Sequence, residues 1–151
     1  MHPAPRFSEM PYTRPVIDDL KRQSARLTDD WDAATTVDEQ VALIHQWDKH
    51  QIAFQSNHTL AMVHFRQATD DPEAKAEKVF FDNAIPVVLE SDLAFLKRVT
   101  GSSHRLALEA QLGKHAFALW DCFLGTFEPA IADLKRKEAQ LGTEYAEILA
   151  G

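Results

Sequence analysis

The chain has 151 residues, of which 45% are hydrophobic and 26% are charged, and its net charge is −7. This composition is typical of soluble globular proteins, argues against intrinsic disorder, and suits one domain at this length. Because the basic side chains are spread along the chain instead of gathering on one stripe, we expect no nucleic-acid partner.

The first fifteen residues are predicted to form an extended arm, and residues 16–151 are predicted to form one helical domain. The arm contains four of the seven prolines, which exclude a regular helix. Thr13 is then expected to cap a first helix with Pro15 in its first turn. Apolar residues at spacings of three and four continue this helix to near Ala34.

A long helix is predicted next, because no glycine or proline occurs between Thr36 and Pro72. Thr36 and Glu39 have the Thr-x-x-Glu spacing of a capping box. The apolar stripe of this helix becomes polar in its middle part, at Gln51, Gln55 and His58. The polar stretch indicates either a surface facing solvent, a cavity or another polar element, or a simple drift of the buried face.

Four more helices are predicted after that. One begins with an aspartate cap and Pro72 and ends at Thr100, with a kink or break expected at Pro86. The next three are a helix capped by Ser102 or Ser103 that ends at Gly113, a helix over 115–124, and a helix from after Pro129 to the C-terminus. No alternating apolar run demands a strand. The predicted fold class is therefore all-α, a bundle of antiparallel helical hairpins with one or two long helices.

The chain's single cysteine, Cys122, excludes an intramolecular disulfide and favours a reducing compartment. It lies in an apolar run, so we expect a buried structural thiol and not a nucleophile. No apolar stretch reaches the ~20 residues that span a bilayer, and no apolar segment of a secretory signal follows the N-terminus. We expect a cytoplasmic protein with no membrane partner.

Seven histidines require a test for metal binding. His45 and His50 are five residues apart, and His58 and His64 are six apart, whereas ligands on one helical face need a spacing of three or four. The sequence has no His-Glu-x-x-His motif. A metal-dependent enzyme using His45, Asp48 and His58 from several helices remains an alternative, but ordinary helix residues are the simpler interpretation. We predict no catalytic residue and no metal ligand in this chain.

Motifs for other chemistries are absent, namely a phosphate loop, a Gly-x-Ser-x-Gly elbow, a Cys-x-x-Cys pair and a dinucleotide fingerprint. Tyr12 and Arg14 have side chains that can bind carboxylates and peptide backbones through hydrogen bonds. Packing or a surface salt bridge is the simpler role for both. The candidate residues for contact with a substrate or another lobe are Tyr12, Arg14, Gln51, Gln55 and His58.

Three collinear motifs resemble one known family. Residues 7–15, Phe-Ser-Glu-Met-Pro-Tyr-Thr-Arg-Pro, resemble the Phe-x-x-Met-x-Tyr-x-Arg-Pro opening of oligoendopeptidase F-like proteins, the M3 metallopeptidases. Residues 69–86 resemble their Thr-x-Asp-Pro helix junction and the Phe-Phe-Asp segment after it. Residues 113–145 carry a similar Gly-Lys, a Thr-Phe-x-Pro and a later tyrosine.

The resemblance implies the non-catalytic N-terminal lobe of a zinc metallopeptidase that hydrolyses short peptides. In that family a His-Glu-x-x-His helix and a downstream glutamate hold zinc, and this chain contains neither, so it is expected to hold no zinc and to be inactive alone. The lobe is expected to form part of the substrate-channel wall, with the missing C-terminal catalytic lobe or a second copy as its partner. The alternative is a free-standing helical interaction or oligomerisation module without enzymatic activity.

Overall fold

The computed structural model describes residues 10–126 and 132–150, which form helices joined by short turns, with no strand among them. The helices are α1 (Ile17–Ala33), α2 (Val37–Gln67), α3 (Pro72–Thr100), α4 (Arg105–Leu112), α5 (Lys114–Thr126) and α6 (Ala132–Ala150). The predicted all-α class is confirmed. No helix in the described ranges is long and apolar enough to cross a membrane.

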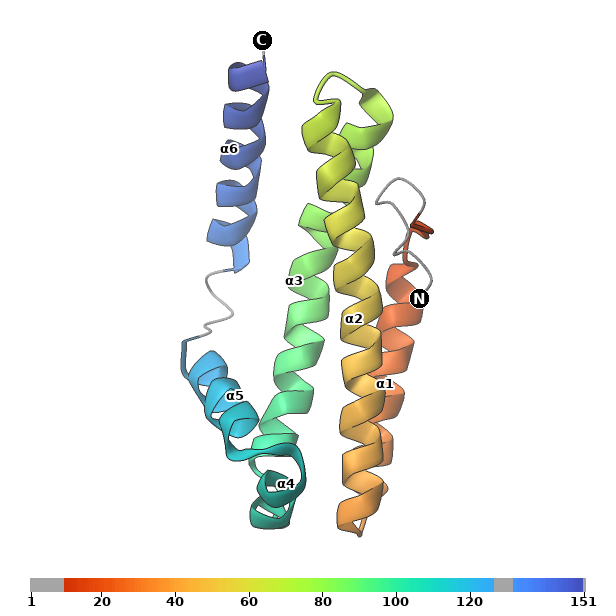
Figure 1. Ribbon diagram of the computed structural model, residues 1–151, viewed down its shortest axis with the longest axis vertical. Helices are drawn as coiled ribbons and strands as arrows, with labels where there is room; N and C mark the ends of the chain where they lie inside the picture. The colour runs from red at the N-terminus through yellow and green to blue at the C-terminus, as the bar shows by residue number, and fades with distance from the viewer. Residues whose placement is uncertain (1–9, 127–131, 151) are drawn as a thin grey trace, which may run out of the picture.

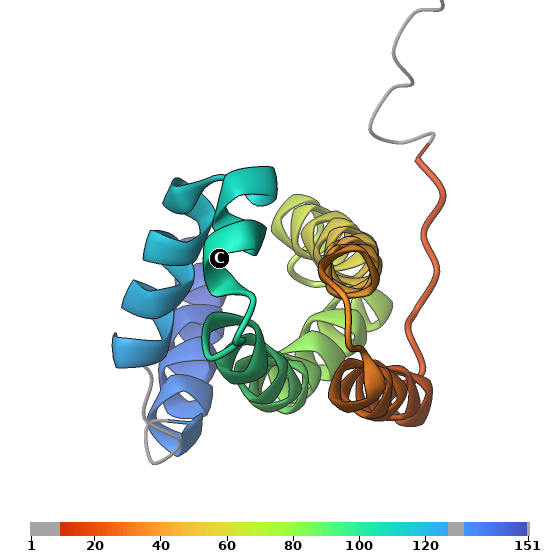
Figure 2. The same cartoon turned by 90° about the horizontal axis from the view of Figure 1, so that it is seen from below.

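Helix α3 is the centre of the arrangement. Helices α2 and α3 form a long antiparallel hairpin, and α1 packs along both of them (Figure 1). Viewed from the end, α1 lies on one side of α3 while α5 and α6 lie on the other (Figure 2). The fold therefore presents the two faces of one helical hairpin to different elements.

Local capping explains where the two long helices begin. Thr36 Oγ1 accepts a hydrogen bond from the backbone N–H of Glu39, and the Glu39 carboxylate accepts one from the backbone N–H of Thr36, as the capping box requires. Asp71 caps α3 by accepting from the backbone N–H of Glu73 at 3.0 Å, with Pro72 as the first helical residue. Both predicted starts are confirmed.

The predicted caps of α1 and α4 are wrong. Val16 occupies the N-cap position of α1, whereas the backbone N–H of Thr13 donates to Asn57 Oδ1 of α2 at 2.9 Å. This hydrogen bond holds the segment before α1 against α2, and α1 begins only at Ile17. His104 is the N-cap of α4, and Ser102 Oγ accepts from its backbone N–H while donating to Gln40 Oε1 at 2.8 Å. The segment before α1 is thus bound to α2, whereas Ser102 bonds both to the start of α4 and to α2.

Helix α3 continues through Pro86, although a kink or break was one expectation for this position. A proline inside a helix removes one backbone hydrogen bond and crowds the preceding turn. Phe81 and Ala84 before it and Leu93 after it are buried, so packing on both sides of the proline holds the helix together.

Two hydrophobic clusters stabilise the bundle. The first cluster joins α1, α2, α3, α4 and α5 through Leu27, Trp31, Ile44, Phe95, Val99, Leu108 and Phe117. The second cluster joins α2 and α3 through Phe54, Ala61, Phe81 and Ala84, with Tyr12, Ile17 and Leu20 packed against it. The buried face of α2 thus shifts along its length, which accounts for the drift in its apolar stripe.

Cys122 is exposed, so the expectation of a buried thiol is wrong. Phe117 on the same helix is fully buried, and Trp120 packs against the first cluster. Five residues along a helix turn a side chain by roughly 140°, which directs Cys122 away from the side that holds Phe117. An apolar run does not reveal which of its residues face the core when only one side of the helix is covered.

Candidate functional site

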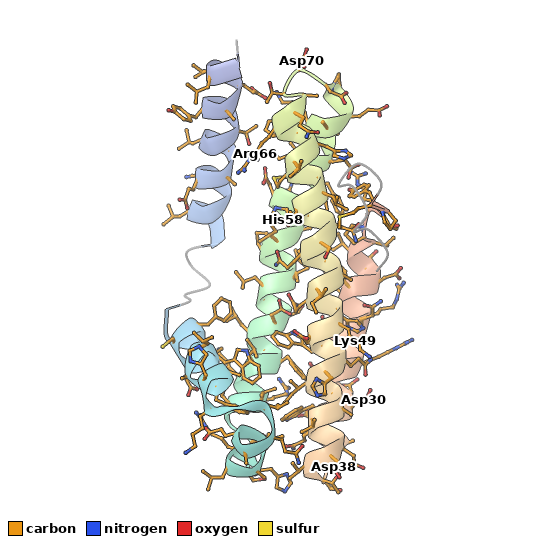
Figure 3. The ribbon with its side chains drawn as sticks, in the orientation of Figure 1. Asp30, Asp38, Lys49, His58, Arg66 and Asp70 are labelled. Atoms are coloured by element: carbon orange, nitrogen blue, oxygen red, sulfur yellow. The ribbon has the colours of Figure 1, made fainter. Side chains whose placement is uncertain are left out.

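One face of α2 carries three of the five candidate residues. Gln51, Gln55 and His58 are spaced by four and three residues, which places them in one row along the helix. Figure 3 shows His58 on the side of the hairpin that also carries α6. Gln51 and His58 are half-buried and Gln55 is exposed, so only Gln55 offers a freely accessible amide in this row.

Asp92 of α3 organises the lower end of this row. Its Oδ1 accepts hydrogen bonds from Trp47 Nε1 at 2.9 Å and from Gln51 Nε2 at 2.5 Å. Burial raises the pKa of Asp92 to about 6, although both hydrogen bonds act in the opposite direction. A cavity of about 20 Å³ adjoins Asp92 between α1, α2 and α3, which is large enough for one water molecule. Gln51 is therefore a partner of a partly buried carboxyl group.

Trp47 extends this contact to α5. Its ring lies 5.9 Å from that of Phe95 and 6.1 Å from that of Trp120, between ring centroids. Such aromatic pairs add to the stability that area burial alone provides. The lower half of the polar row is thus fixed from three helices, α2, α3 and α5.

His58 forms the upper end of the row. Its ring centroid lies 5.3 Å from that of Phe81, and burial lowers the pKa of His58 while the charge of Asp82 opposes that shift. Lys78 is buried and pairs with Asp82 at 2.6 Å, and its Nζ lies 3.5 Å from the carbonyl oxygen of Ala139 on α6. An imidazole whose pKa is lowered by burial therefore lies beside an ion pair that also contacts α6.

Tyr12 and Arg14 lie elsewhere, against the α3 residue Glu77. The Tyr12 hydroxyl donates a hydrogen bond to the Glu77 carboxylate, and Arg14 Nε lies 3.3 Å from the same carboxylate. The Arg14 guanidinium also stacks 4.3 Å from the ring centroid of Phe80. Burial and the neighbouring carboxylate raise the pKa of the Tyr12 phenol, which keeps it protonated.

An open groove of about 570 Å³ adjoins this second cluster. Its charged and polar lining includes Tyr12, Arg14, His64, Asp71, Glu73 and Glu77. The two arm residues are held by Glu77 at the edge of the groove. The structure thus separates the five candidate residues into the row on α2 and the pair on the arm.

The donor groups do not fit a zinc ion. Within 10–126 and 132–150, no three His, Cys, Asp or Glu side chains are grouped so that they could hold a metal ion. Lys78 forms an ion pair with Asp82, and Trp47 and Gln51 both donate hydrogen bonds to one oxygen of Asp92. We therefore derive no metal chemistry from these residues.

Sequence reasoning missed Asp92, Glu77 and Lys78. Asp92 lies three residues after Leu89 and four before Leu96, so it falls on the apolar stripe of α3. A lone acid in such a stripe signals a buried carboxyl group with a polar partner. Glu77 carries no comparable signal, because its partner Tyr12 is 65 residues away along the chain. Lys78 and Asp82 have the i,i+4 spacing of a helical ion pair, but the contact of Lys78 with Ala139 spans 61 residues and has no local signal.

A family model described as the Peptidase M3 N-terminal domain matches residues 7–127. The chain belongs to this family. A search of curated proteins finds no match. The predicted resemblance to M3 peptidases is therefore confirmed over residues 7–127.

Solved structures extend the comparison. PZ peptidase A with inhibitor 2 has a TM-score of 0.87 and 28% identity over 93% of this chain. A protein named as an oligoendopeptidase F has a TM-score of 0.87 and 29% identity over 94% of the chain. Another protein of that name, from Bacillus anthracis str. Ames, has a TM-score of 0.86 and 30% identity over 91%. The chain spans 25% of the length of each of these structures.

Proposed function

We propose that this M3 N-terminal domain is a non-catalytic lobe of an oligoendopeptidase F-like zinc metallopeptidase and forms part of the wall of its peptide channel. The likeness at 28% identity to one quarter of PZ peptidase A carries this proposal. Zinc and the groups that activate water belong to the rest of the enzyme, since the described residues contain no group that fits a metal ion. The enzyme acts on short peptides in the cytoplasm.

The row on α2 is the part of the lobe that faces the peptide. A peptide backbone presents N–H and C=O groups, and an exposed glutamine amide both donates and accepts hydrogen bonds. Gln55 is exposed in this row, while Gln51 is held by Asp92 and His58 lies against Phe81. Gln55 is therefore the side chain that contacts substrate, and its neighbours fix the position of the helix.

A hybrid enzyme tests this function. Residues 1–151 replace the matching quarter of the Bacillus anthracis protein, and hydrolysis of quenched-fluorescent peptides is measured. The expected result is a zinc-dependent hydrolase in which Gln55→Ala raises KM about three- to tenfold with little change in kcat, as for the loss of one or two substrate hydrogen bonds. A folded, zinc-loaded hybrid that hydrolyses no peptide would overturn the proposal.

The matched control is Gln46→Ala. Gln46 is an exposed glutamine on the same helix, and nine residues of separation place it about 180° around the helix from Gln55. Its substitution should leave KM unchanged. Equal effects of the two substitutions would mean that α2 contributes stability and not peptide contact.

A further inference from the structure

Two glutamines in the row on α2 lie one helical turn apart in different surroundings. Gln51 is half-buried and Gln55 is exposed. Side chains four residues apart on a helix are neighbours, and two amides at this spacing can hydrogen-bond to each other, since each has donors and an acceptor. Such a pair would occupy the Gln55 amide. The partner that Gln51 binds therefore decides whether Gln55 is free for another molecule.

Asp92 on α3 gives Gln51 a different partner. Its Oδ1 accepts hydrogen bonds from Gln51 Nε2 at 2.5 Å and from Trp47 Nε1 at 2.9 Å. A carboxylate only accepts, so Gln51 has to direct its N–H groups toward α3. The indole of Trp47 only donates, so it requires an acceptor oxygen at this point. Because the Trp47 ring is itself packed against Phe95 and Trp120, contacts from three helices hold the Gln51 amide on α3.

We propose that Asp92 is a positioning residue for peptide binding, which holds the Gln51 amide on α3 and leaves the Gln55 amide free to contact the peptide backbone. This inference rests on the proposed function, in which Gln55 contacts substrate. Without an acceptor at position 92, Gln51 is released to pair with Gln55. A peptide must then compete with that pair, so its affinity falls by an amount set by the strength of the pair.

Two variants at position 92 separate the role of the acceptor from that of the charge. Asp92→Leu removes the acceptor, and the lining of the adjoining cavity offers the new side chain apolar neighbours that include Leu27 and Val88. Asp92→Asn keeps an oxygen, which the donor-only indole of Trp47 orients toward α2, so Gln51 stays held. Circular dichroism establishes that both variants are folded.

Side-chain amide NMR of the 151-residue chain tests the hold on Gln51 without any enzyme activity. The Gln55 amide resonances should shift in Asp92→Leu and stay in place in Asp92→Asn. In the double variant Asp92→Leu/Gln51→Ala, they should match those of Gln51→Ala alone, because no partner for Gln55 remains on that turn. Unshifted Gln55 amides in Asp92→Leu, or a shift that persists in the double variant, would overturn the proposal.

Peptide hydrolysis by the hybrid enzyme then tests the consequence for substrate. Asp92→Leu should raise KM about two- to threefold with kcat unchanged, the size expected for competition with one exposed pair at this spacing. Adding Gln51→Ala should abolish the rise, and Asp92→Asn should show none. A rise that persists without Gln51 would overturn the proposal, since it would reflect a general structural effect. If NMR detects the Gln51–Gln55 pair and KM is still unchanged, the failure lies in the proposed peptide contact of Gln55 and not in the hold of Asp92 on Gln51.

Discussion

The indole N–H of Trp47 on α2 and the amide of Gln51 one turn later donate hydrogen bonds to the same carboxylate oxygen of Asp92 on α3. A partly buried acceptor that is shared in this way adds a polar link between the two helices to their apolar packing. Gln51 therefore acts on the stability of the hairpin, and Gln55 is the polar residue of the row that is free for another partner.

Asp92→Asn should stabilise the protein at neutral pH and have a smaller effect in acid. Folding raises the pKa of Asp92 from its ordinary 3.8 to about 6, so the folded protein binds this proton more tightly than the unfolded chain. The stabilisation from protonation is full below pH ~4 and is lost as the pH rises through ~6. Thermal unfolding at pH 7.5 should show a gain on the order of 1 kcal/mol, or about 2–4 °C, for the variant.

The control for the Asp92 prediction is Trp47→Phe. This change keeps an aromatic ring against Phe95 and Trp120 but removes the donor to Asp92. The pKa of Asp92 should then rise further, because the Trp47 hydrogen bond lowers it. A stability difference between Asp92→Asn and the parent that does not change between pH 7.5 and pH 4 would contradict the assignment.

Phe81→Ala should cost about 3–5 kcal/mol of unfolding free energy. The Phe81 side chain is fully buried, and its ring lies 5.6 Å from Phe54 and 5.2 Å from Phe80, between centroids. Urea denaturation measures the loss. Val79→Ala on the same helix, where the side chain is 47% exposed, should cost less than about 1 kcal/mol. Similar losses at the two positions would show that the second cluster is not the core described above.

Thr36→Ala should cost about 1 kcal/mol, since it removes the side-chain half of the capping box at the start of α2. Thr35→Ala is the control, because only its backbone N–H bonds to Glu39. Chemical denaturation of the two variants compares them directly. A Thr35→Ala loss equal to that of Thr36→Ala would mean that the box does not stabilise the helix start.

Glu77→Ala should free the arm. Glu77 accepts from the Tyr12 hydroxyl and pairs with Arg14, so its loss removes both polar contacts of the arm with α3. Chymotryptic cleavage after Tyr12, followed by mass spectrometry, should accelerate about three- to tenfold, as expected for contacts of this exposure. Glu73→Ala in the same groove should leave the rate unchanged. An unaltered rate in Glu77→Ala would mean that apolar packing of Tyr12 alone holds the arm.

The sequence predicts the helices well wherever their ends are decided locally. Thr36, Asp71 and Pro72 set the starts of α2 and α3 through contacts within three residues. The starts of α1 and α4 differ from the prediction, and there Thr13 and Ser102 each bond to a residue of α2, Asn57 and Gln40, that no local pattern reveals.

The same difference between local and tertiary contacts applies to the candidate residues. Helical periodicity predicts that Gln51, Gln55 and His58 lie on one face. The hydrogen bond from Gln51 to Asp92 could not be predicted in this way, because it depends on how α2 and α3 pack. Cys122 was expected inside because its neighbours are apolar, and it is exposed because α5 is covered on one side only.

Peptide capture in the hybrid enzyme tests the channel-wall proposal most directly. A photo-crosslinking amino acid is placed at position 55 or at position 46 of α2, and a non-hydrolysable peptide is bound to the zinc-loaded hybrid before illumination. Cross-linking is expected from position 55, competed away by substrate, and none is expected from position 46. Cross-linking from position 46 alone, or from neither position in a hybrid that hydrolyses peptides, would contradict the proposal that this face of α2 lines the channel.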